Sequence, residues 1–384
     1  MSAKVIIAGD LCLQDRAARM PIADLCNCHS AVKQLTETVD YSIVNLECSV
    51  TNDNSAKPIK KAGKALCNSD KVLDLARFMG FDAVTLANNH FADYGQGAVK
   101  ESLELIESRN LDHVGAGVSL YDSQKILYKT INGINVAFIN ACEHEFTIAT
   151  SNKGGCNPLN AISLYYNIIE AKKKSDDVIV VIHGGHEEYQ LPTPRMQQMY
   201  RFFVDVGASV VVNHHQHCFS GYEVYKGCPI FYGLGNFSFD GNVLGSDTWN
   251  EGYMVKLLIE DTVAFELIPY IQNENTVGIS LMNDEQVTAF QNKMKELNDV
   301  ISDSRRLEEA MRQMVESKKD KYMRPLKPYQ YGPLLKLIKW HLVPKKLANK
   351  LIPEYMTLER KMMLKSYFQC ESHQEVMNNL LENE

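Results

Sequence analysis

The chain has 384 residues, of which 45% are hydrophobic and 23% are charged, and its formal net charge at pH 7 is -7. This length and composition suit one large α/β domain with an appendage, or two domains. The acidic balance gives no indication of nucleic-acid binding, which usually appears as a basic domain, so no nucleic-acid partner is expected.

The N-terminus and the cysteines suggest a compartment. The opening residues, MSAKVIIAGD, lack a charged segment followed by an apolar run, so no signal peptide is predicted. No stretch approaches the roughly 20 apolar residues of a membrane helix. The ten cysteines form no CxxC pairs, and disulfide frameworks belong mainly to small secreted chains. We therefore expect reduced thiols and a cytoplasmic location.

Strand-like and helix-like segments alternate up to about residue 240. Apolar runs predict buried strands, and apolar residues at helical spacing predict helices between them. The expected strands are 5–8, 41–46, 83–87, 126–131, 134–139, 177–182, 209–212, 228–232, 253–259 and 263–268, and the expected helices are 97–108 and 195–206. Asn132-Gly133 is a strong hairpin signal. The alternation predicts an α/β fold whose sheets are partly antiparallel. A parallel dinucleotide-binding sheet is not favoured, because no GxGxxG follows the first strand.

The C-terminal part has a different character. Asn283 and Gln286 resemble a capping pair before a helical run that extends to Ile301, and a second helix is expected at 307–317. The sequence therefore predicts a main domain over 1–275 and a helical C-terminal extension over 283–384.

A basic stretch lies within this extension. Residues 318–350 contain ten Lys or Arg against one acid, Asp320, with leucines and Trp340 among them. We expect a solvated helix that packs on the main domain. The alternative is peripheral contact with an anionic membrane surface.

The most informative pattern is a set of polar side chains placed where predicted strands end. Their residue types are those that bind metals or transfer protons. They are Asp10, Glu47, Asn89, His90, His183, His215 and His217. Ligands of open α/β sheets bind at the carboxyl ends of the strands. Each residue alone has an ordinary reading, such as a turn former, a solvated carboxylate or a core histidine, but together they predict a metal site.

These residue types suit one chemistry. Carboxylates, an Asn carbonyl and neutral imidazoles match Mn, Fe, Zn or Ni better than Ca. A bridging carboxylate can hold two divalent ions about 3.5–4 Å apart, which is the arrangement of two-metal hydrolases. His90 follows Asn89 directly and is placed to protonate a leaving group. His186 and Glu187 follow His183 in a loop that could line the site. His29 and the histidines elsewhere lack such context and are interpreted as structural or surface residues.

The motifs as a group resemble a known family. The matching pieces are Gly9-Asp10, Asn45-Leu46-Glu47, Ala87-Asn88-Asn89-His90, His183-Gly184-Gly185-His186-Glu187, His214-His215-Gln216-His217 and Gly233-Leu234-Gly235-Asn236-Phe237. In order and spacing, over roughly residues 4 to 270, they are similar to the bacterial capsule-synthesis family of the CapA, poly-gamma-glutamate type. That family itself resembles calcineurin-like metallophosphoesterases.

The resemblance implies a fold and a site. The fold would be an α/β/β/α sandwich of mixed sheets. Asp10, Glu47, Asn89, His183, His215 and His217 would be metal ligands, His90 the acid, and Glu187 a loop carboxylate near the substrate. The sequence departs from classical phosphoesterases at Cys12, where they carry a histidine, and at Leu46-Glu47, where they carry Gly-Asp.

Two classes of function remain open at this stage. The first is a metal-dependent, phosphoesterase-like hydrolase linked to capsule or poly-gamma-glutamate metabolism, and the same metal site could instead cleave an amide of a polyglutamate chain. The second is a non-catalytic module that handles the polymer or a partner during capsule assembly. The expected partner is a small-molecule substrate or an anionic polymer.

Overall fold

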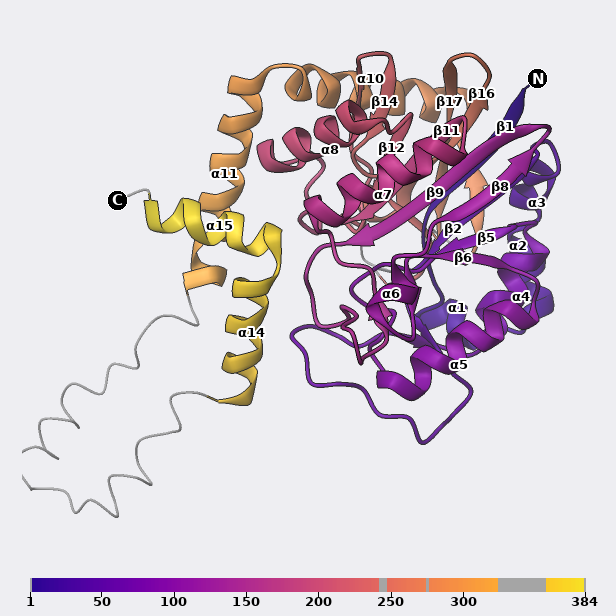
Figure 1. The fold of residues 1–384 in the computed structure, drawn as a ribbon, viewed down its shortest axis with the longest axis horizontal. Helices are drawn as coiled ribbons and strands as arrows, with labels where there is room; N and C mark the ends of the chain where they lie inside the picture. Colours follow the sequence, from indigo (N-terminus) through magenta and orange to yellow (C-terminus); the bar gives the residue numbers. More distant parts are fainter. Residues whose placement is uncertain (1, 242–246, 274–275, 324–356, 383–384) are drawn as a thin grey trace, which may run out of the picture. The chain divides into compact units, whose positions relative to one another are not determined.

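The computed structural model describes residues 2–241, 247–273, 276–323 and 357–382 (Figure 1). These residues form two compact units, which are described separately. The first contains Met1–Ile59 and Ala65–Met311, and the second contains Lys60–Lys64 and Arg312–Glu384.

The first sheet of the larger unit has a parallel half and an antiparallel half. Among the described residues the strand order is β18-β17-β16-β1-β2-β5-β6, with β15 also paired to β1. Strands β1, β2, β5, β6 and β15 are joined by parallel pairings, whereas β16, β17 and β18 extend the sheet from β1 in antiparallel fashion. The bounds are β1 Ala3–Cys12, β2 Tyr41–Leu46, β5 Ala83–Thr85, β6 Asp112–Val114, β15 Asn236–Phe239, β16 Glu251–Ile259, β17 Val263–Gln272 and β18 Ile279–Leu281.

The second sheet is also mixed. Its order is β13-β14-β12-β11-β9-β8, with parallel pairings among β14, β12, β11 and β9 and an antiparallel strand at each edge. The bounds are β8 Leu127–Ile131, β9 Ile134–Cys142, β11 Asp177–His183, β12 Val210–His214, β13 Tyr222–Tyr225 and β14 Cys228–Phe231. The predicted hairpin is confirmed, because Asn132 and Gly133 have φ angles of 49° and 85°, as a two-residue hairpin turn requires.

Helices and short strands complete this unit. The short paired strands are β3 Ser49–Val50 with β4 Cys67–Asn68, and β7 Ala116–Gly117 with β10 Gly155–Cys156. The helices are α1 Asp15–Arg19, α2 Ile22–Cys28, α3 Ser30–Thr36, α4 Lys71–Phe78, α5 Gly95–Ser108, α6 Leu120–Ser123, α7 Ala161–Lys174, α8 Pro194–Val206, α9 Asp247–Asn250 and α10 Asp284–Ile301.

Alternating side chains along the strands build three apolar layers. On β1, Val5 and Ile7 point into a core shared by the two sheets, where they join Val181 and Val212 of the second sheet. Ile6 and Ala8, on the opposite face of β1, pack with residues of α2 to α5. On the outer face of the second sheet, Val180 and Ile182 pack with residues of α7 and α8. Both helices lie along this sheet in Figure 1. The predicted α/β/β/α sandwich is therefore confirmed.

Helix α10 belongs to the core of the larger unit. Its predicted capping pair is present, because the Asn283 side chain accepts a hydrogen bond from the Gln286 backbone and the Gln286 side chain accepts one from the Asn283 backbone. Phe290 and Met294 are buried in the core between the sheets. The predicted C-terminal extension begins at residue 283, whereas the C-terminal segment of the second compact unit begins at Arg312. The predicted division into a domain over 1–275 and an extension over 283–384 stays a prediction.

The smaller unit is helical. It contains the end of α11 Ser304–Met323, together with α14 Leu358–Gln369 and α15 Glu371–Glu382. The rings of Tyr322 and Tyr367 stack with centroids 4.8 Å apart, and Tyr322 Oη lies 2.6 Å from His373 Nδ1. Most of the basic stretch 318–350 lies outside the described residues. Within the described residues, no helix combines the length and the apolar character that a membrane span needs.

His29 makes the larger unit sensitive to acid. It is fully buried after α2, with Nδ1 2.7 Å from Leu25 O and Nε2 2.8 Å from Ser238 Oγ. Burial lowers the pKa of its imidazole below 6.5, so the folded state holds the neutral ring while the unfolded chain takes up a proton more readily. The stabilising contribution is complete above about pH 6.5 and is lost as pH falls below it, at up to about 1.4 kcal/mol per pH unit.

We therefore expect a His29→Gln variant to lose less unfolding free energy than the wild type between pH 7 and pH 5. Urea unfolding at several pH values measures this difference. Because other buried histidines contribute equally to both proteins, parallel pH profiles would contradict the role of His29.

Candidate metal centre

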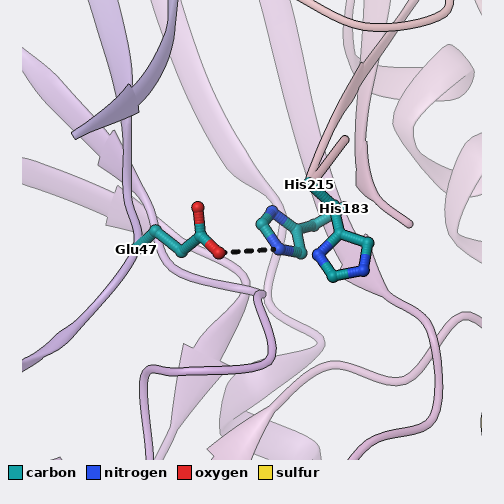
Figure 2. Close-up of side chains that lie close together, drawn as sticks. All are labelled: Glu47, His183 and His215. Atoms are coloured by element: carbon teal, nitrogen blue, oxygen red, sulfur yellow. Dashed lines mark ion pairs between the residues drawn. The ribbon is translucent and has the colours of Figure 1, made fainter. Parts of the chain in front are cut away.

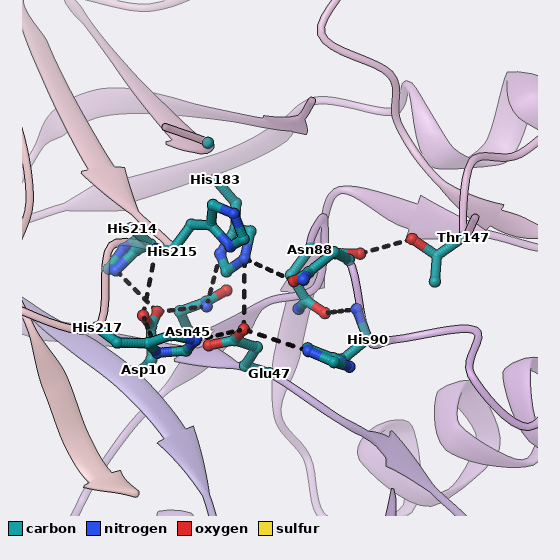
Figure 3. A network of polar contacts seen from close by, with 12 residues as sticks. Asp10, Asn45, Glu47, Asn88, His90, Thr147, His183, His214, His215 and His217 are labelled. Carbon is teal, nitrogen blue, oxygen red and sulfur yellow. Dashed lines mark hydrogen bonds and ion pairs between the residues drawn. The ribbon is translucent and has the colours of Figure 1, made fainter. Parts of the chain in front are cut away.

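Strands of both sheets bring the predicted residues to one edge of the sandwich. Asp10 lies on β1, Glu47 follows β2, and Asn89 and His90 follow β5. The second sheet contributes His183 at the end of β11 and, after β12, His215 and His217. Apart from Asn89, these side chains are labelled in Figure 3, which shows them converging from the two sheets. Because the central strands of both sheets are parallel, their carboxyl ends meet at this edge, as the sequence predicts.

Glu47 lies at the middle of the cluster. Its Oε1 atom is 3.5 Å from His183 Nε2, 3.7 Å from His217 Nε2 and 4.0 Å from His90 Nε2. Figure 2 shows Glu47 facing His183, with the ring of His215 beside it. The centroids of the His183 and His215 rings are 4.7 Å apart. Asn89 Oδ1 lies 3.0 Å from His183 Nε2, so it is directed at the same point.

Asp10 is held at one end of the cluster. Its Oδ1 accepts a 2.7 Å hydrogen bond from Asn45 Nδ2 and lies 3.3 Å from His214 Nδ1, and its Oδ2 accepts a 3.2 Å hydrogen bond from the backbone of His215. Burial works to raise the pKa of this carboxyl, but the neighbouring histidines, His214 first, bring the pKa below its usual value. Asp10 is therefore an anion in the absence of a bound ion.

Gly9 allows this strand to reach the site. A Cβ atom at this position would lie 2.0 Å from the carbonyl oxygen of Gly235, whose carbonyl accepts a hydrogen bond from the Asp10 backbone. The close approach of β1 to the segment before β15 therefore depends on the absence of a side chain.

The electrostatics of the site suit a cation. Glu47 is completely buried, and among the described residues neither of its carboxylate oxygens has a hydrogen-bond partner. Burial, and then the neighbouring Asp10, raise the pKa of Glu47 well above its ordinary value. Burial lowers the pKa of His183 and of His215, which keeps both imidazoles in the neutral form that binds metals. Unpaired carboxylate oxygens beside neutral imidazoles fit a divalent metal ion.

Three groups of side chains within the described residues offer ligand atoms that all lie within 4.8 Å of one another in this region. Two are buried, Glu47 with His183 and His215, and Asp10 with Glu47 and His217. They share Glu47, as a bridging carboxylate would require. The third combines exposed Glu187 with His215 and His217. The predicted ligands are thus brought together, and their roles as ligands stay predictions.

His90 points at Glu47 from the side of the first sheet. Its Nδ1 lies 2.6 Å from Oδ2 of the buried Asp93, which also accepts a hydrogen bond from the Leu66 backbone. The His90 backbone is held by Asn88 Oδ1 at 3.0 Å. The contact between Nδ1 and Asp93 fixes the orientation of the ring, so that Nε2 faces Glu47. A proton donor and its orienting carboxylate have this geometry.

The loop after β12 reaches the site in an unexpected way. Alternation along an extended backbone would place the side chains of His215 and His217 on one side. The backbone here is not extended, since His215 and His217 have φ angles of 89° and 56°, and both rings still reach the cluster. Residues other than glycine rarely adopt positive φ, and such strain is common at functional sites.

Several supporting residues of the site were not predicted from the sequence. Asn45 links Asp10 to His183, whose Nδ1 is 3.3 Å from Asn45 Nδ2. Asn236 Oδ1 lies 2.9 Å from His217 Nδ1 and leaves Nε2 to face Glu47. His214 lies beside Asp10. All three stand inside the quoted motifs, but only the tertiary contacts reveal what they orient.

Cys12 occupies the position where classical phosphoesterases carry a histidine. It is fully buried in the helix-side core and receives a 3.4 Å hydrogen bond from Gln14 Nε2. It is not a member of the metal-capable groups found among the described residues.

The fold and the site together define a two-sheet α/β protein with a candidate metal centre at one edge of its sheets. Residues 4–241 match the family described as bacterial capsule synthesis protein PGA_cap. The chain belongs to this family, which confirms the predicted resemblance.

Two sequence relatives agree with this family assignment. The chain is 38% identical over 213 residues to the PGA biosynthesis protein CapA of Bacillus subtilis, a match that covers 54% of this chain and 56% of the relative. It is 35% identical over 209 residues to the capsule biosynthesis protein CapA of Bacillus anthracis, covering 52% and 51%. The matched region thus spans about half the length of these curated relatives.

A comparison with solved structures finds a 5'-nucleotidase precursor from Thermus thermophilus. The TM-score is 0.43 with 12% identity, over 79% of this chain and 59% of that chain. At this level of similarity the fold assignment rests on the strand order described above.

Proposed function

We propose that this protein is a metal-dependent hydrolase of phosphoester type that acts in capsule or poly-gamma-glutamate metabolism. Its metal ligands would be the six residues gathered at the sheet edge. They are Asp10, Glu47, Asn89, His183, His215 and His217. The donor set of carboxylate, amide and imidazole suits Mn, Fe, Zn or Ni.

The observation that carries this proposal is the state of Glu47. A carboxylate whose two oxygens are buried without hydrogen bonds is costly unless a cation neutralises it. Glu47 is shared by two groups of metal-capable side chains, so two divalent ions are proposed. When bound, such ions would lower the pKa of a water and neutralise negative charge on the substrate.

The remaining residues would manage protons and geometry. His90, oriented by Asp93, would donate a proton to the leaving oxygen. Asn45 would hold Asp10 and His183 in register through its amide. Glu187, exposed on the loop after β11, would lie on the substrate side.

The link to a capsule polymer rests on the family and its relatives. The names of the two Bacillus relatives refer to PGA and capsule biosynthesis. An ester within or attached to an anionic polymer is therefore the substrate class we propose. The competing role is a module that handles such a polymer without catalysis.

Metal analysis combined with a hydrolysis assay tests the proposal. For protein purified without chelators, we expect inductively coupled plasma mass spectrometry to find about two divalent ions per chain. We also expect metal-dependent cleavage of p-nitrophenyl or bis(p-nitrophenyl) phosphate. His215→Ala should lose metal and activity, whereas His113→Ala, which removes a surface histidine paired with Glu107, should lose neither.

The outcomes separate the two roles. A chain that binds no metal under any loading condition would contradict the proposed metal-dependent hydrolase function. A chain that binds metal but cleaves no phosphoester would favour the polymer-handling role.

A further inference from the structure

We infer that Glu187, His215 and His217 form an outer metal position on the solvent side of the buried centre. Their ligand atoms all lie within 4.8 Å of one another. Glu187 is exposed, and the two histidines retain 8% and 6% exposure, whereas Glu47 has none. An ion that enters from solvent would therefore meet this position before it reaches Glu47.

The loop that carries Glu187 is fixed against the loop that carries the histidines. The Glu188 backbone donates a 2.9 Å hydrogen bond to Gln216 O. In return, Gln216 Nε2 donates to the carbonyl oxygens of Tyr189 at 2.7 Å and of Leu191 at 3.1 Å. Gln216 stands between the two histidines, so these bonds set Glu187 relative to both rings. The outer position is thus built by the fold rather than by a chance approach of a surface side chain.

The outer position shares its imidazoles with the buried groups. His215 also belongs with Glu47 and His183, and His217 also belongs with Asp10 and Glu47. The Nδ1 atom of His217 is engaged by Asn236 Oδ1 at 2.9 Å, which leaves Nε2 as its ligand atom. Because a neutral imidazole offers one nitrogen lone pair, an ion at the outer position competes with the buried ions for these two histidines, and Glu187 provides a third carboxylate beside Glu47 and Asp10.

The donors define the class of ion. Two imidazoles and one carboxylate suit Zn, Fe or Mn, whereas Ca prefers oxygen ligands alone. Three protein ligands facing solvent leave coordination positions open, as in sites that exchange ligands. If the protein is the proposed hydrolase, an ion at the outer position would also assist substrate binding, and this role rests on the proposed function. An anionic phosphoester would be repelled by the Glu187 carboxylate unless a cation lies between them.

A zinc titration of the metal-free protein tests the inference. In the Glu47→Gln protein, whose buried centre is expected to be empty, we expect the added Glu187→Gln change to weaken the binding of one Zn²⁺ ion by at least about tenfold, measured in competition with a chromophoric chelator. The matched control adds Glu188→Gln instead, which removes the neighbouring exposed carboxylate and keeps the backbone bond to Gln216. This control should titrate like the Glu47→Gln protein. Equal titrations of the two variants would overturn the outer position.

A second measurement separates this inference from the proposed function. In a Glu47→Gln background the outer position should still hold one weakly bound ion, and the added Glu187→Gln change should remove it. If Glu187→Gln has no effect while Glu47→Gln releases metal, the outer metal position is contradicted and the proposed hydrolase function is retained. If Glu187→Gln weakens zinc binding but the wild type cleaves no phosphoester, the outer metal position is supported and the proposed hydrolase function is contradicted.

Discussion

Replacing Glu47 with glutamine is expected to empty the buried metal centre without unfolding the metal-free protein. The carboxylate is fully buried, its oxygens have no hydrogen bond among the described residues, and Asp10 raises its electrostatic cost. A neutral amide of the same shape removes that cost, so the metal-free variant should be as stable as the metal-free wild type, or more stable. The metal-loaded proteins should differ in the opposite sense, because only the wild type gains stability from ions bound at the buried centre.

Thermal unfolding with and without a chelator measures both effects. The wild type should lose several degrees of Tm on chelation, whereas Glu47→Gln, which keeps only the weakly bound outer ion, should show a much smaller change. Glu104→Gln, which removes an exposed carboxylate on α5, serves as the control and should follow the wild type. Retention of the full chelator-sensitive shift in Glu47→Gln would contradict the proposed bridging role of Glu47.

Replacing His90 with glutamine should lower kcat by about 10²- to 10⁴-fold while the bound metal is retained. The His90 ring faces Glu47 at 4.0 Å but is oriented by Asp93, so its removal leaves the proposed ligands in place. The loss should be largest for alkyl phosphoesters, whose leaving oxygen needs a proton. It should be much smaller for p-nitrophenyl esters, whose leaving group departs as an anion.

Steady-state kinetics on the two ester classes, combined with metal analysis, check this expectation. Asp93→Asn should give a smaller loss of kcat on the same substrates, because it disturbs the orientation of His90 without removing the ring. Equal losses on both ester classes, or loss of metal from His90→Gln, would mean that His90 supports the centre instead of donating a proton.

Hydrophobic periodicity and the polar residues at predicted strand ends were enough to predict most residues of the candidate metal centre from the sequence. Asp10, Glu47, His183, His215 and His217 could be selected because each follows an apolar run, and parallel strands deliver their ends to a common edge. The same logic could not find Asn45, since an asparagine inside a buried strand has no sequence signal that separates a positioning role from a packing role. Its function emerges only from bonds to Asp10 and His183, which lie 35 and 138 residues away.

The backbone of the His215–His217 loop illustrates a second limit. An HxH spacing is compatible with rings on one side of an extended strand, but the chain turns through positive φ at both histidines. Hydrogen bonds from Gln216 to Tyr189 and Leu191 hold that turn. Such contacts connect segments that are distant in sequence, so local propensity cannot predict them.

By itself, the sequence determined an α/β fold with partly antiparallel sheets and the strand-end residues that gather at one edge, because hydrophobic alternation and strand-end chemistry are local properties. The two-sheet sandwich and the family followed from the resemblance of the motifs. Only the tertiary structure decided that α10 closes the core between the sheets, that Glu47 lies buried among the histidines, and that Glu187 faces His215 and His217. The reason is physical. Burial, pKa and ligand geometry depend on which distant segments exclude water from a side chain, and no single segment carries that information.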